Sequence, residues 1–298
     1  TLSVSFQDEK NQSILASITQ LDNEKIEKFS FRNKDEINKA VSRINQKKFS
    51  ITDISSKVVN RNPSGPFTTS TLQQTASSRL GFGASRTMQI AQKLYQGVEI
   101  EGETIGLITY MRTDGTNLSK DAVAAFRDYI KKEIGNEYLP ENVLNYSGKK
   151  AKNAQEAHEA IRPTDIVRTP QNVKKYLSTD QNKLYDLIWS RALSSQMQSA
   201  KFDRNTITIT SDNNDTICKA SGSVLKFDGF LKIYNNQSKD DDENILPSVS
   251  KGLVNIESLI DEQHFTQPPP RYSEASLVKK LEELGIGRPS TYASIIST

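Results

Sequence analysis

The sequence predicts an α+β, multidomain protein in which a mostly helical lobe is inserted into a β-rich domain. Residues 1–31 alternate apolar and polar side chains, and this period returns after about residue 200, as in antiparallel strands with one solvent-exposed face. From Thr69 onward, apolar side chains instead recur at helical spacing. We therefore expect one β domain assembled from both flanks, with the helical lobe attached by two connections on which it can swing.

The N-terminal flank, residues 1–68, has the pattern of a hairpin, a helix and a long strand. LSVSF and ILASITQL alternate on either side of a polar, turn-like stretch, and KDEINKAVSRI has helical spacing. KKFSITDISSKVV is strand-like, and the prolines and glycine that follow it break regular structure.

The helical section, residues 69–198, is expected to hold several helices around one short apolar run. A helix should begin at Ser119, a good N-cap residue, and stop at Gly135. The preceding run GLITYM is either a short strand or a buried segment. Further helices are expected in STLQQTASSRL, SRTMQIAQKLY, QEAHEAIRP (ended by Pro163) and NKLYDLIWSRALSSQM.

The C-terminal flank, residues 199–267, returns to the two-residue period before a proline-rich linker. Beyond it, residues 268–298 predict two short helices around a glycine-rich turn, the first with Leu277, Leu281 and Leu284 on its apolar side. The strands of this flank are expected in NTITIT, TICKASG, SVLKFDGFLKIY and LVNIESLI.

The composition excludes several classes of protein. A formal charge of +3 over 298 residues is too small to indicate nucleic acid by itself. Cys218 is the single cysteine, so neither a disulfide framework nor a cysteine zinc site can form within the chain. No apolar run approaches the roughly 18 residues of a membrane span. Because the chain starts at Thr1 and ends within the helical pattern YASIIST, we expect it to be a piece of a longer protein.

Tyr110 and Arg112 form the most suggestive pair in the sequence. On an extended segment, side chains two residues apart project to the same side, so a phenol and a guanidinium can face one point. A phenolate that attacks phosphorus forms a phosphotyrosine ester, and the planar fork of arginine binds phosphate oxygens and stabilises developing charge. A packed tyrosine beside a surface arginine is the simpler interpretation of these two residues alone.

His158 and Arg162 lie four residues apart, so on a helix they would share one face and present donors to a phosphate. Glu156 and Glu159 surround the histidine, and a solvated helix with ion pairs is the alternative. No second histidine or cysteine stands at metal-ligand spacing. The acidic residues 240–243 lack the pattern of a cation loop, and the chain has no phosphate-binding glycine loop of the nucleotide-binding kind.

Arg271, Ser273 and Arg288 flank the C-terminal helices. At helix N-termini, backbone N–H groups, hydroxyls and guanidinium groups can converge on phosphates. Helix capping explains Ser273 equally well.

Five segments together resemble bacterial DNA topoisomerases of the type IA class, in particular the topoisomerase I branch. The resemblance runs from about residue 63 to the end of the chain and more loosely through the preceding residues. The segments are GPFTTSTLQQTASSRLGFGASRTMQIAQKLYQG, GLITYMRTDGTNLS, AQEAHEAIRPTD, FDGFLKIY and HFTQPPPRYSEASLVKKLEELGIGRPSTYASIIST, in this order.

The resemblance implies specific roles for these residues. Tyr110 matches the family's nucleophile, which becomes joined to a 5′ phosphate of single-stranded DNA, and Arg112 matches the arginine that stabilises the scissile phosphate. His158 corresponds to a histidine that contacts DNA near the active site. The implied DNA-binding set also includes Arg162, Arg271, Ser273 and Arg288, and we expect no metal ligands in the chain.

The resemblance also implies an architecture. Residues 1–68 and 199–267 correspond to the β-rich arch of the type IA toroid, residues 69–198 to the helical domain with the catalytic tyrosine, and residues 268–298 to the start of the domain that binds the single strand. Gly115 departs from the family motif, which usually has serine there.

The family's N-terminal acidic (Toprim) domain, which supplies a catalytic glutamate and aspartates that bind Mg²⁺, has no counterpart in these residues, and neither does the C-terminal part of the family. We therefore expect a central fragment that binds no cofactor itself and does not relax DNA alone. The complete enzyme is expected to relax negatively supercoiled DNA without ATP, as a cytoplasmic, nucleoid-associated monomer that acts on single-stranded DNA and makes no membrane contact.

Two alternatives differ from this reading. A non-catalytic fragment that binds single-stranded nucleic acid, or serves as a scaffold, would keep Tyr110 merely packed. A tyrosine recombinase or relaxase also uses phosphotyrosine chemistry, but more histidines or arginines than the chain has would be expected around Tyr110.

Overall fold

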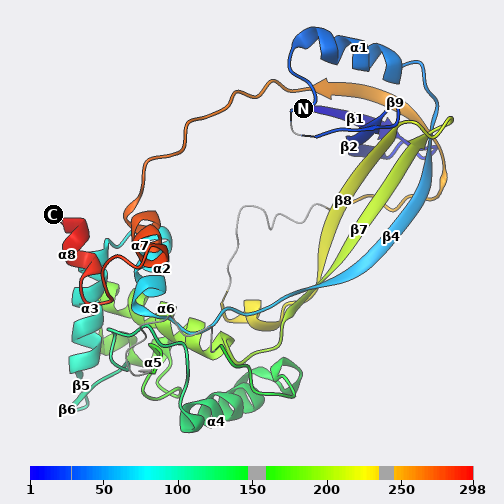
Figure 1. Ribbon diagram of the computed structural model, residues 1–298. Coiled ribbons are helices and arrows are strands. Elements are labelled where there is room, and N and C mark those ends of the chain that lie inside the picture. The colour runs from blue at the N-terminus through cyan, green and yellow to red at the C-terminus, as the bar shows by residue number, and fades with distance from the viewer. Residues whose placement is uncertain (28, 147–158, 235–244, 298) are drawn as a thin grey trace. The chain divides into compact units, whose positions relative to one another are not determined.

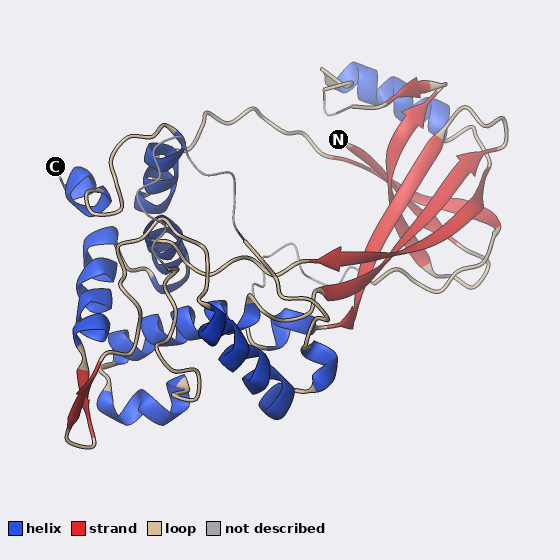
Figure 2. Cartoon of the chain, turned by 60° about the horizontal axis from the view of Figure 1, so that its bottom comes forward, coloured by secondary structure: helices blue, strands red, loops and turns tan. Residues whose placement is uncertain are grey.

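The computed structural model describes residues 1–27, 29–146, 159–234 and 245–297, which fall into two compact units (Figure 1). Unit 1 comprises the described residues within Thr1–Arg61, Lys201–Phe227 and Gln237–Pro268. Unit 2 comprises those within Asn62–Ala200, Asp228–Asn236 and Pro269–Thr298. Strands dominate unit 1 and helices dominate unit 2 (Figure 2), so the α+β class predicted from the sequence is confirmed.

Unit 1 is a closed sheet. Its strands follow the order β1-β9-β4-β7-β8-β2-β3, and an additional pairing of β1 with β2 joins the ends into a barrel from which β3 extends. Every pairing with a described register is antiparallel. The strands are β1 Leu2–Gln7, β2 Ser13–Leu21, β3 Glu24–Lys25, β4 Phe49–Arg61, β7 Ala200–Ser211, β8 Ile217–Phe227 and β9 Gly252–Asp261.

The predicted alternation produces the barrel core. In β1, Leu2, Val4 and Phe6 are buried while the residues between them are partly exposed. Phe6 packs against Phe49 with ring centroids 5.1 Å apart. Helix α1 (Lys34–Ile44) buries Ala40 and Ile44 against the same apolar core. Burial of a side chain as large as isoleucine or phenylalanine stabilises the fold by roughly 1.5–3 kcal/mol. The core therefore lies between α1 and the inner faces of the strands.

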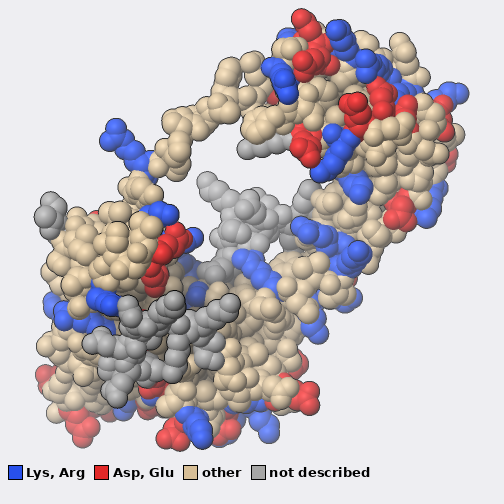
Figure 3. Space-filling model, in the orientation of Figure 1, with Lys and Arg blue, Asp and Glu red and all other residues tan. Residues whose placement is uncertain are grey.

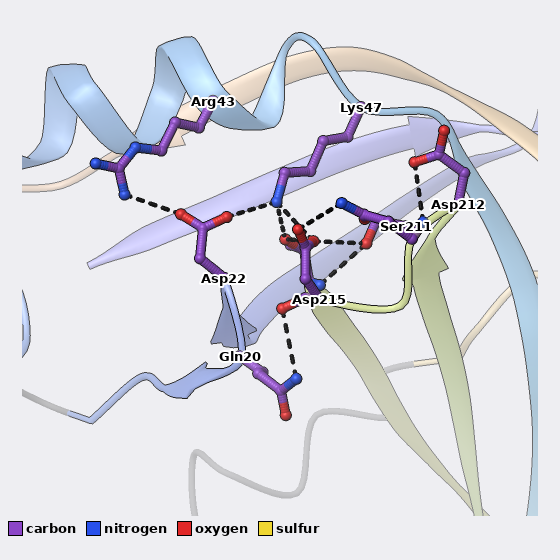
Figure 4. Close-up of polar contacts among 9 residues, drawn as sticks. Gln20, Asp22, Arg43, Lys47, Ser211, Asp212 and Asp215 are labelled. Carbon is purple, nitrogen blue, oxygen red and sulfur yellow. Dashed lines mark hydrogen bonds and ion pairs between the residues drawn. The ribbon is translucent and has the colours of Figure 1, made fainter.

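A polar network ties the end of α1 to two turns of the barrel (Figure 4). The ammonium of Lys47 lies 2.6 Å from a carboxylate oxygen of Asp22 and 2.6 Å from one of Asp215, and it donates to the Thr216 hydroxyl at 2.8 Å. Arg43 donates to the other oxygen of Asp22 at 2.8 Å. The network joins the β2–β3 turn, the β7–β8 turn and the helix.

Unit 2 is built around α6 (Thr179–Ser194), a helix buried on more than one side. Leu184, Tyr185, Ile188 and Trp189 are all buried, and the polar tips of the two aromatic rings are satisfied by backbone carbonyls. The other helices are α2 Thr69–Leu80, α3 Ala84–Gln96, α4 Lys120–Tyr129, α5 Pro170–Val173, α7 Glu274–Glu283 and α8 Tyr292–Ser297. A small hairpin joins β5 Val98–Ile100 to β6 Glu103–Ile105. Short π or 3-10 helical turns cover Ile130–Ile134, Asn136–Tyr138, Lys174–Tyr176 and Gly229–Lys232.

Several local expectations from the sequence are confirmed. Helix α4 begins after Ser119, whose hydroxyl accepts the N–H of Ala122, and the helical run ends at Gly135. Helix α1 spans the predicted stretch, and α2 and α3 are separated by a turn in which Gly81 adopts a φ of 68°, the left-handed region that favours glycine.

Of the two forms expected for GLITYM, the structure shows the buried segment: Leu107, Ile108 and Met111 are buried, and one isolated bridge joins Ile108 to Pro163. Two other local expectations are wrong. The described end of QEAHEAIRP, residues 159–163, is extended rather than helical, because it pairs with neighbouring segments. In α7, Leu284 is 59 % exposed, and the buried residue is Val278.

Candidate active site

Residues 106–118 run between β6 and α4 and place Tyr110 and Arg112 at the surface of unit 2. Leu107, Ile108 and Met111 are buried, which anchors the run by the hydrophobic effect. Tyr110 is 42 % exposed and Arg112 is also exposed. Since the intervening Met111 is buried, the phenol and the guanidinium flank one buried position and are both accessible to a ligand.

Two buried or half-buried threonines fix the backbone of this run. Thr69, in the first turn of α2, donates its hydroxyl to the carbonyl of Met111 at 2.7 Å and accepts the N–H of Thr113 at 2.8 Å. Thr109 donates its hydroxyl to the carbonyl of Ala160 at 2.7 Å and its backbone N–H to the carbonyl of Arg162 at 2.9 Å, and its hydroxyl accepts the N–H of Arg162 at 3.0 Å. The residues on each side of Tyr110 are therefore held by different elements.

Tyr95, at the end of α3, contacts the candidate nucleophile directly. Its ring meets that of Tyr110 edge to face, with centroids 5.2 Å apart, a favourable arrangement for aromatic pairs. Gly106 packs closely against the backbone of Tyr95, because it has no side chain. A Cβ at position 106 would lie 2.7 Å from the carbonyl oxygen of Tyr95.

Arg162 lies beside the same segment but faces a carboxylate. Its guanidinium binds both oxygens of Glu159, at 2.6 and 3.0 Å, and donates to the carbonyl of Pro163. Glu159 also accepts the backbone N–H of Ser119 at 2.7 Å. Although partial burial acts to raise it, the hydrogen bonds from Arg162 and Ser119 lower the pKa of Glu159.

Because of this ion pair, Arg162 is not the freely accessible phosphate donor that the sequence predicts. The helical face that was to bring His158 and Arg162 together does not exist in the described residues 159–163. Arg162 is mostly buried, so a contact with DNA would require it to leave Glu159. His158 and residues 240–243 lie outside the described residues.

The remaining predicted residues lie at the ends of the C-terminal helices. Arg271 and Arg288 are exposed. Ser273 is the N-cap of α7, and its hydroxyl accepts the N–H of Ser276. The capping interpretation of Ser273 is thus confirmed, while its contact with DNA stays a prediction.

Helix α7 packs against α2 and α3 through two acidic side chains. Glu274 accepts the N–H of Ala84 at the start of α3 at 2.7 Å, and Glu282 accepts the hydroxyl of Ser70 at 2.6 Å. Burial raises the pKa of Tyr292 in α8, and the carboxylate of Glu282 adds to the shift. Helix α7 therefore lies against the two helices, α2 and α3, that carry Thr69 and Tyr95.

Neither a metal site nor a membrane span emerges from the part of the chain that the structure describes. No group of three or more histidine, cysteine or acidic side chains is arranged to hold a metal there. No described helix is both long enough and apolar enough to cross a bilayer. On the face in Figure 3, basic and acidic side chains are interspersed, in keeping with the small net charge.

Sequence reasoning missed the groups that surround the candidate pair. Thr69 and Tyr95 come from two other parts of the chain, α2 and α3, and Thr109 directly precedes Tyr110. The stretch TTST at residues 68–71 was a usable signal, because four small hydroxyl residues at a helix start exceed what one N-cap requires.

Comparisons with known proteins point to one family. A family model described as DNA topoisomerase matches residues 1–298. A curated relative named DNA topoisomerase 1 from Rickettsia typhi is 50% identical over 300 residues, covering 99% of this chain and 38% of the relative. A protein of the same name from Xylella fastidiosa (strain 9a5c) is 48% identical, covering 96% of this chain and 36% of the relative.

A solved structure agrees with these sequence relatives. The full-length topoisomerase I from Thermotoga maritima matches with a TM-score of 0.75 and 34% identity, covering 99% of this chain and 46% of that chain. The chain therefore spans less than half the length of each of these proteins.

Proposed function

Because the chain belongs to the DNA topoisomerase family, we propose that it forms the central part of a type IA enzyme. That enzyme cleaves and rejoins one DNA strand and relaxes negatively supercoiled DNA without ATP. The observation that carries the proposal is the exposed pair Tyr110 and Arg112 on an anchored segment.

The proposed reaction is a transesterification at phosphorus. The phenol oxygen of Tyr110 attacks the scissile phosphate, a Tyr–O–P bond forms, and the P–O3′ bond breaks. The phenol proton ends on the 3′ oxygen, which leaves as a free hydroxyl, while the 5′ phosphoryl group stays on Tyr110. Because one phosphodiester replaces another, the reverse attack by the 3′ hydroxyl reseals the strand without ATP.

Arg112 would stabilise the charge that develops on the phosphate. Its guanidinium can donate two parallel hydrogen bonds to the non-bridging oxygens, and donors aimed at developing charge account for a large share of many rate enhancements. The exposure of Arg112 beside Tyr110 supports this role.

The strand itself would be held by more distant groups. His158, Arg162, Arg271, Ser273 and Arg288 stay our candidates for contacts with single-stranded DNA. Arg271 and Arg288 are exposed, which suits phosphate binding.

Mg²⁺ does not fit the described residues, which offer no cluster of three metal ligands. We propose that the acidic domain of the complete enzyme supplies its ligands. We also propose that the complete enzyme works as a monomer in the cytoplasm, at the nucleoid.

Covalent trapping tests the proposal. The sample is a chimera in which residues 1–298 replace the matching segment of the Rickettsia typhi relative, mixed with Mg²⁺ and a 3′-labelled single-stranded oligonucleotide. On a denaturing gel we expect a shifted, labelled protein band, because the 5′ phosphoryl group carries the label onto Tyr110. Tyr110→Phe should abolish the band and leave oligonucleotide binding within about twofold of the parent, since only the nucleophilic oxygen is lost.

The intact relative serves as the positive control, and circular dichroism shows whether each variant is folded. If the folded chimera binds the oligonucleotide but forms no adduct while the relative does, the chain is a non-catalytic binding module. An adduct that persists in Tyr110→Phe would show that another residue is the nucleophile.

A further inference from the structure

Thr69 contacts the backbone on both sides of Arg112. Its hydroxyl donates to the carbonyl of Met111 at 2.7 Å, shares that hydrogen with the carbonyl of Thr113 at 3.1 Å, and accepts the N–H of Thr113 at 2.8 Å. Its own backbone N–H donates to the Thr113 carbonyl at 2.9 Å. One residue thus binds both neighbours of the exposed arginine.

These bonds lie in a dry environment. Thr69 is 0 % exposed, Met111 1 % and Thr113 2 %. Water cannot replace a hydrogen bond lost there, so the polar groups would carry the full cost of desolvation. If the Thr69 hydroxyl is removed, the backbone around Arg112 must either shift or leave buried polar groups without hydrogen bonds.

The support for Thr69 is rigid. It stands in the first turn of α2, and Leu72 and Ala76 of the same helix are fully buried. A helix fixes a contact more sharply than a loop does. Thr69 therefore connects the backbone beside Arg112 to the core of unit 2, and its hydroxyl makes three of the hydrogen bonds in this connection.

We propose that Thr69 is a positioning residue that sets the direction in which Arg112 presents its guanidinium to the reacting phosphate. The proposal rests on the function proposed above. Bidentate recognition of phosphate demands a defined approach of the planar fork, and a displacement of about 1 Å can lower a rate by about a hundredfold. Thr69 touches no substrate atom itself and acts through the Met111 and Thr113 peptide groups.

Thr69→Val tests the role of the hydroxyl, because valine keeps the shape but can neither donate to Met111 nor accept from Thr113. In the chimera we expect the single-turnover rate constant of adduct formation to fall by about tenfold to a hundredfold, with the oligonucleotide Kd changed by less than about threefold. Thr69→Ser keeps the hydroxyl and should restore the rate to within about threefold of the parent.

Coupling to Arg112 separates positioning from a general loss of stability. In an Arg112→Ala background, Thr69→Val should lower the rate constant no further, because its route to the phosphate is already gone. Thr71→Val is the matched control: it removes a hydroxyl of the same helical turn that takes part in the capping box but has no hydrogen bond to residues 111–113 among those described. It should keep the parent rate despite a lower melting temperature.

A measurement independent of activity completes the test. In the 298-residue chain, hydrogen exchange at the Thr113 amide should speed up by at least about tenfold in Thr69→Val and stay at the parent value in Thr69→Ser, since exchange reports opening of individual hydrogen bonds. The inference is overturned if the parent chimera forms the adduct and Thr69→Val forms it at the same rate. It is also overturned if Thr69→Val and Thr71→Val lower the rate constant equally. Both outcomes leave the proposed function intact. Absence of any parent adduct would instead count against the proposed function.

Discussion

At the scale of single residues, Asp215 carries the clearest electrostatic signature in unit 1. Partial burial acts to raise its pKa, but hydrogen bonds from Lys47, Thr216 and Ser211 outweigh this and hold the pKa at about 2. The hydrogen bond from Lys47 likewise lowers the pKa of Asp22. Two carboxylates thus share one cation, of which only 12 % of the side chain is exposed.

The folded-state pKa of Asp215 lies below its ordinary value of 3.8, so its charge stabilises the folded state above about pH 4, and this contribution is lost as the pH falls toward about 2. Asp215→Asn should therefore lower the free energy of unfolding by on the order of 1 kcal/mol at pH 7, after allowance for solvent screening. The difference should decrease below about pH 4 and disappear below about pH 2. Urea denaturation followed by far-UV circular dichroism from about pH 7 to about pH 1.5 measures it.

Asp212→Asn is the control, because Asp212 lies in the same turn, is exposed, and its carboxylate accepts the adjacent N–H of Asn213. A pH-independent difference between Asp215→Asn and the parent would contradict the charge-based explanation.

At the scale of elements, the pair of Glu159 and Arg162 joins the start of α4 to the extended residues 159–163. Two oxygens of Glu159 meet two guanidinium nitrogens, and one of those oxygens also accepts the N–H of Ser119. Such bidentate, partly buried pairs are stronger than exposed ones. The ends of the 106–118 run are thereby tied to a second stretch of chain.

Glu159→Gln should lower the free energy of unfolding of unit 2 by about 1–3 kcal/mol, because it removes one member of a mostly buried ion pair. Thermal unfolding followed by Trp189 fluorescence measures this change. The pair of Arg168 and Asp165, 3.3 Å apart and more accessible to solvent, supplies the comparison. Asp165→Asn should cost less than about 1 kcal/mol, and equal losses in the two variants would refute the assigned strength of the buried pair.

At the scale of the whole molecule, the chain covers 38% of the Rickettsia typhi relative. The described residues bring together a phenol and a guanidinium but no cluster of metal ligands. Under the proposed function, these residues supply the nucleophile and its neighbouring arginine.

We expect the purified 298-residue chain alone to leave negatively supercoiled plasmid unrelaxed with Mg²⁺ present, because acid–base assistance to the phenol and organisation of the phosphate are incomplete. Agarose gel electrophoresis of plasmid after incubation is the measurement, and the chimera is the positive control. Relaxation by the chain alone at a rate comparable to that of the chimera would contradict this expectation.

The sequence predicted elements well wherever a period ran for several residues. The alternation of β1 and the helical spacing of α1, α2 and α6 appear in the structure, because burial of one face decides such segments. The three-residue strands β5 and β6 escaped detection, since they are too short to show a period. The spacing of residues 159–163 predicts a helix, but in the structure Ile161 pairs with Phe67 and Pro163 pairs with Ile108. Local spacing cannot reveal such distant partners.

The candidate site was predictable only in part. The spacing of Tyr110 and Arg112 predicts that both side chains face one side, and the structure shows both exposed, with the buried Met111 between them. The hydroxyl of Thr69 reaches across 42 and 44 residues of sequence to Met111 and Thr113, and no local pattern records such a contact. The roles of the predicted site residues remain predictions.

The division into two units also separates the chain's chromophores. All ten tyrosines and the single tryptophan fall within the residue ranges of unit 2, and none within those of unit 1. The barrel is therefore optically silent above about 280 nm, and intrinsic fluorescence follows the helical unit alone. Any denaturation curve that combines fluorescence with peptide-bond absorption will resolve the two units without a label, and a tryptophan introduced into the barrel would report on that unit without competition from other residues in it.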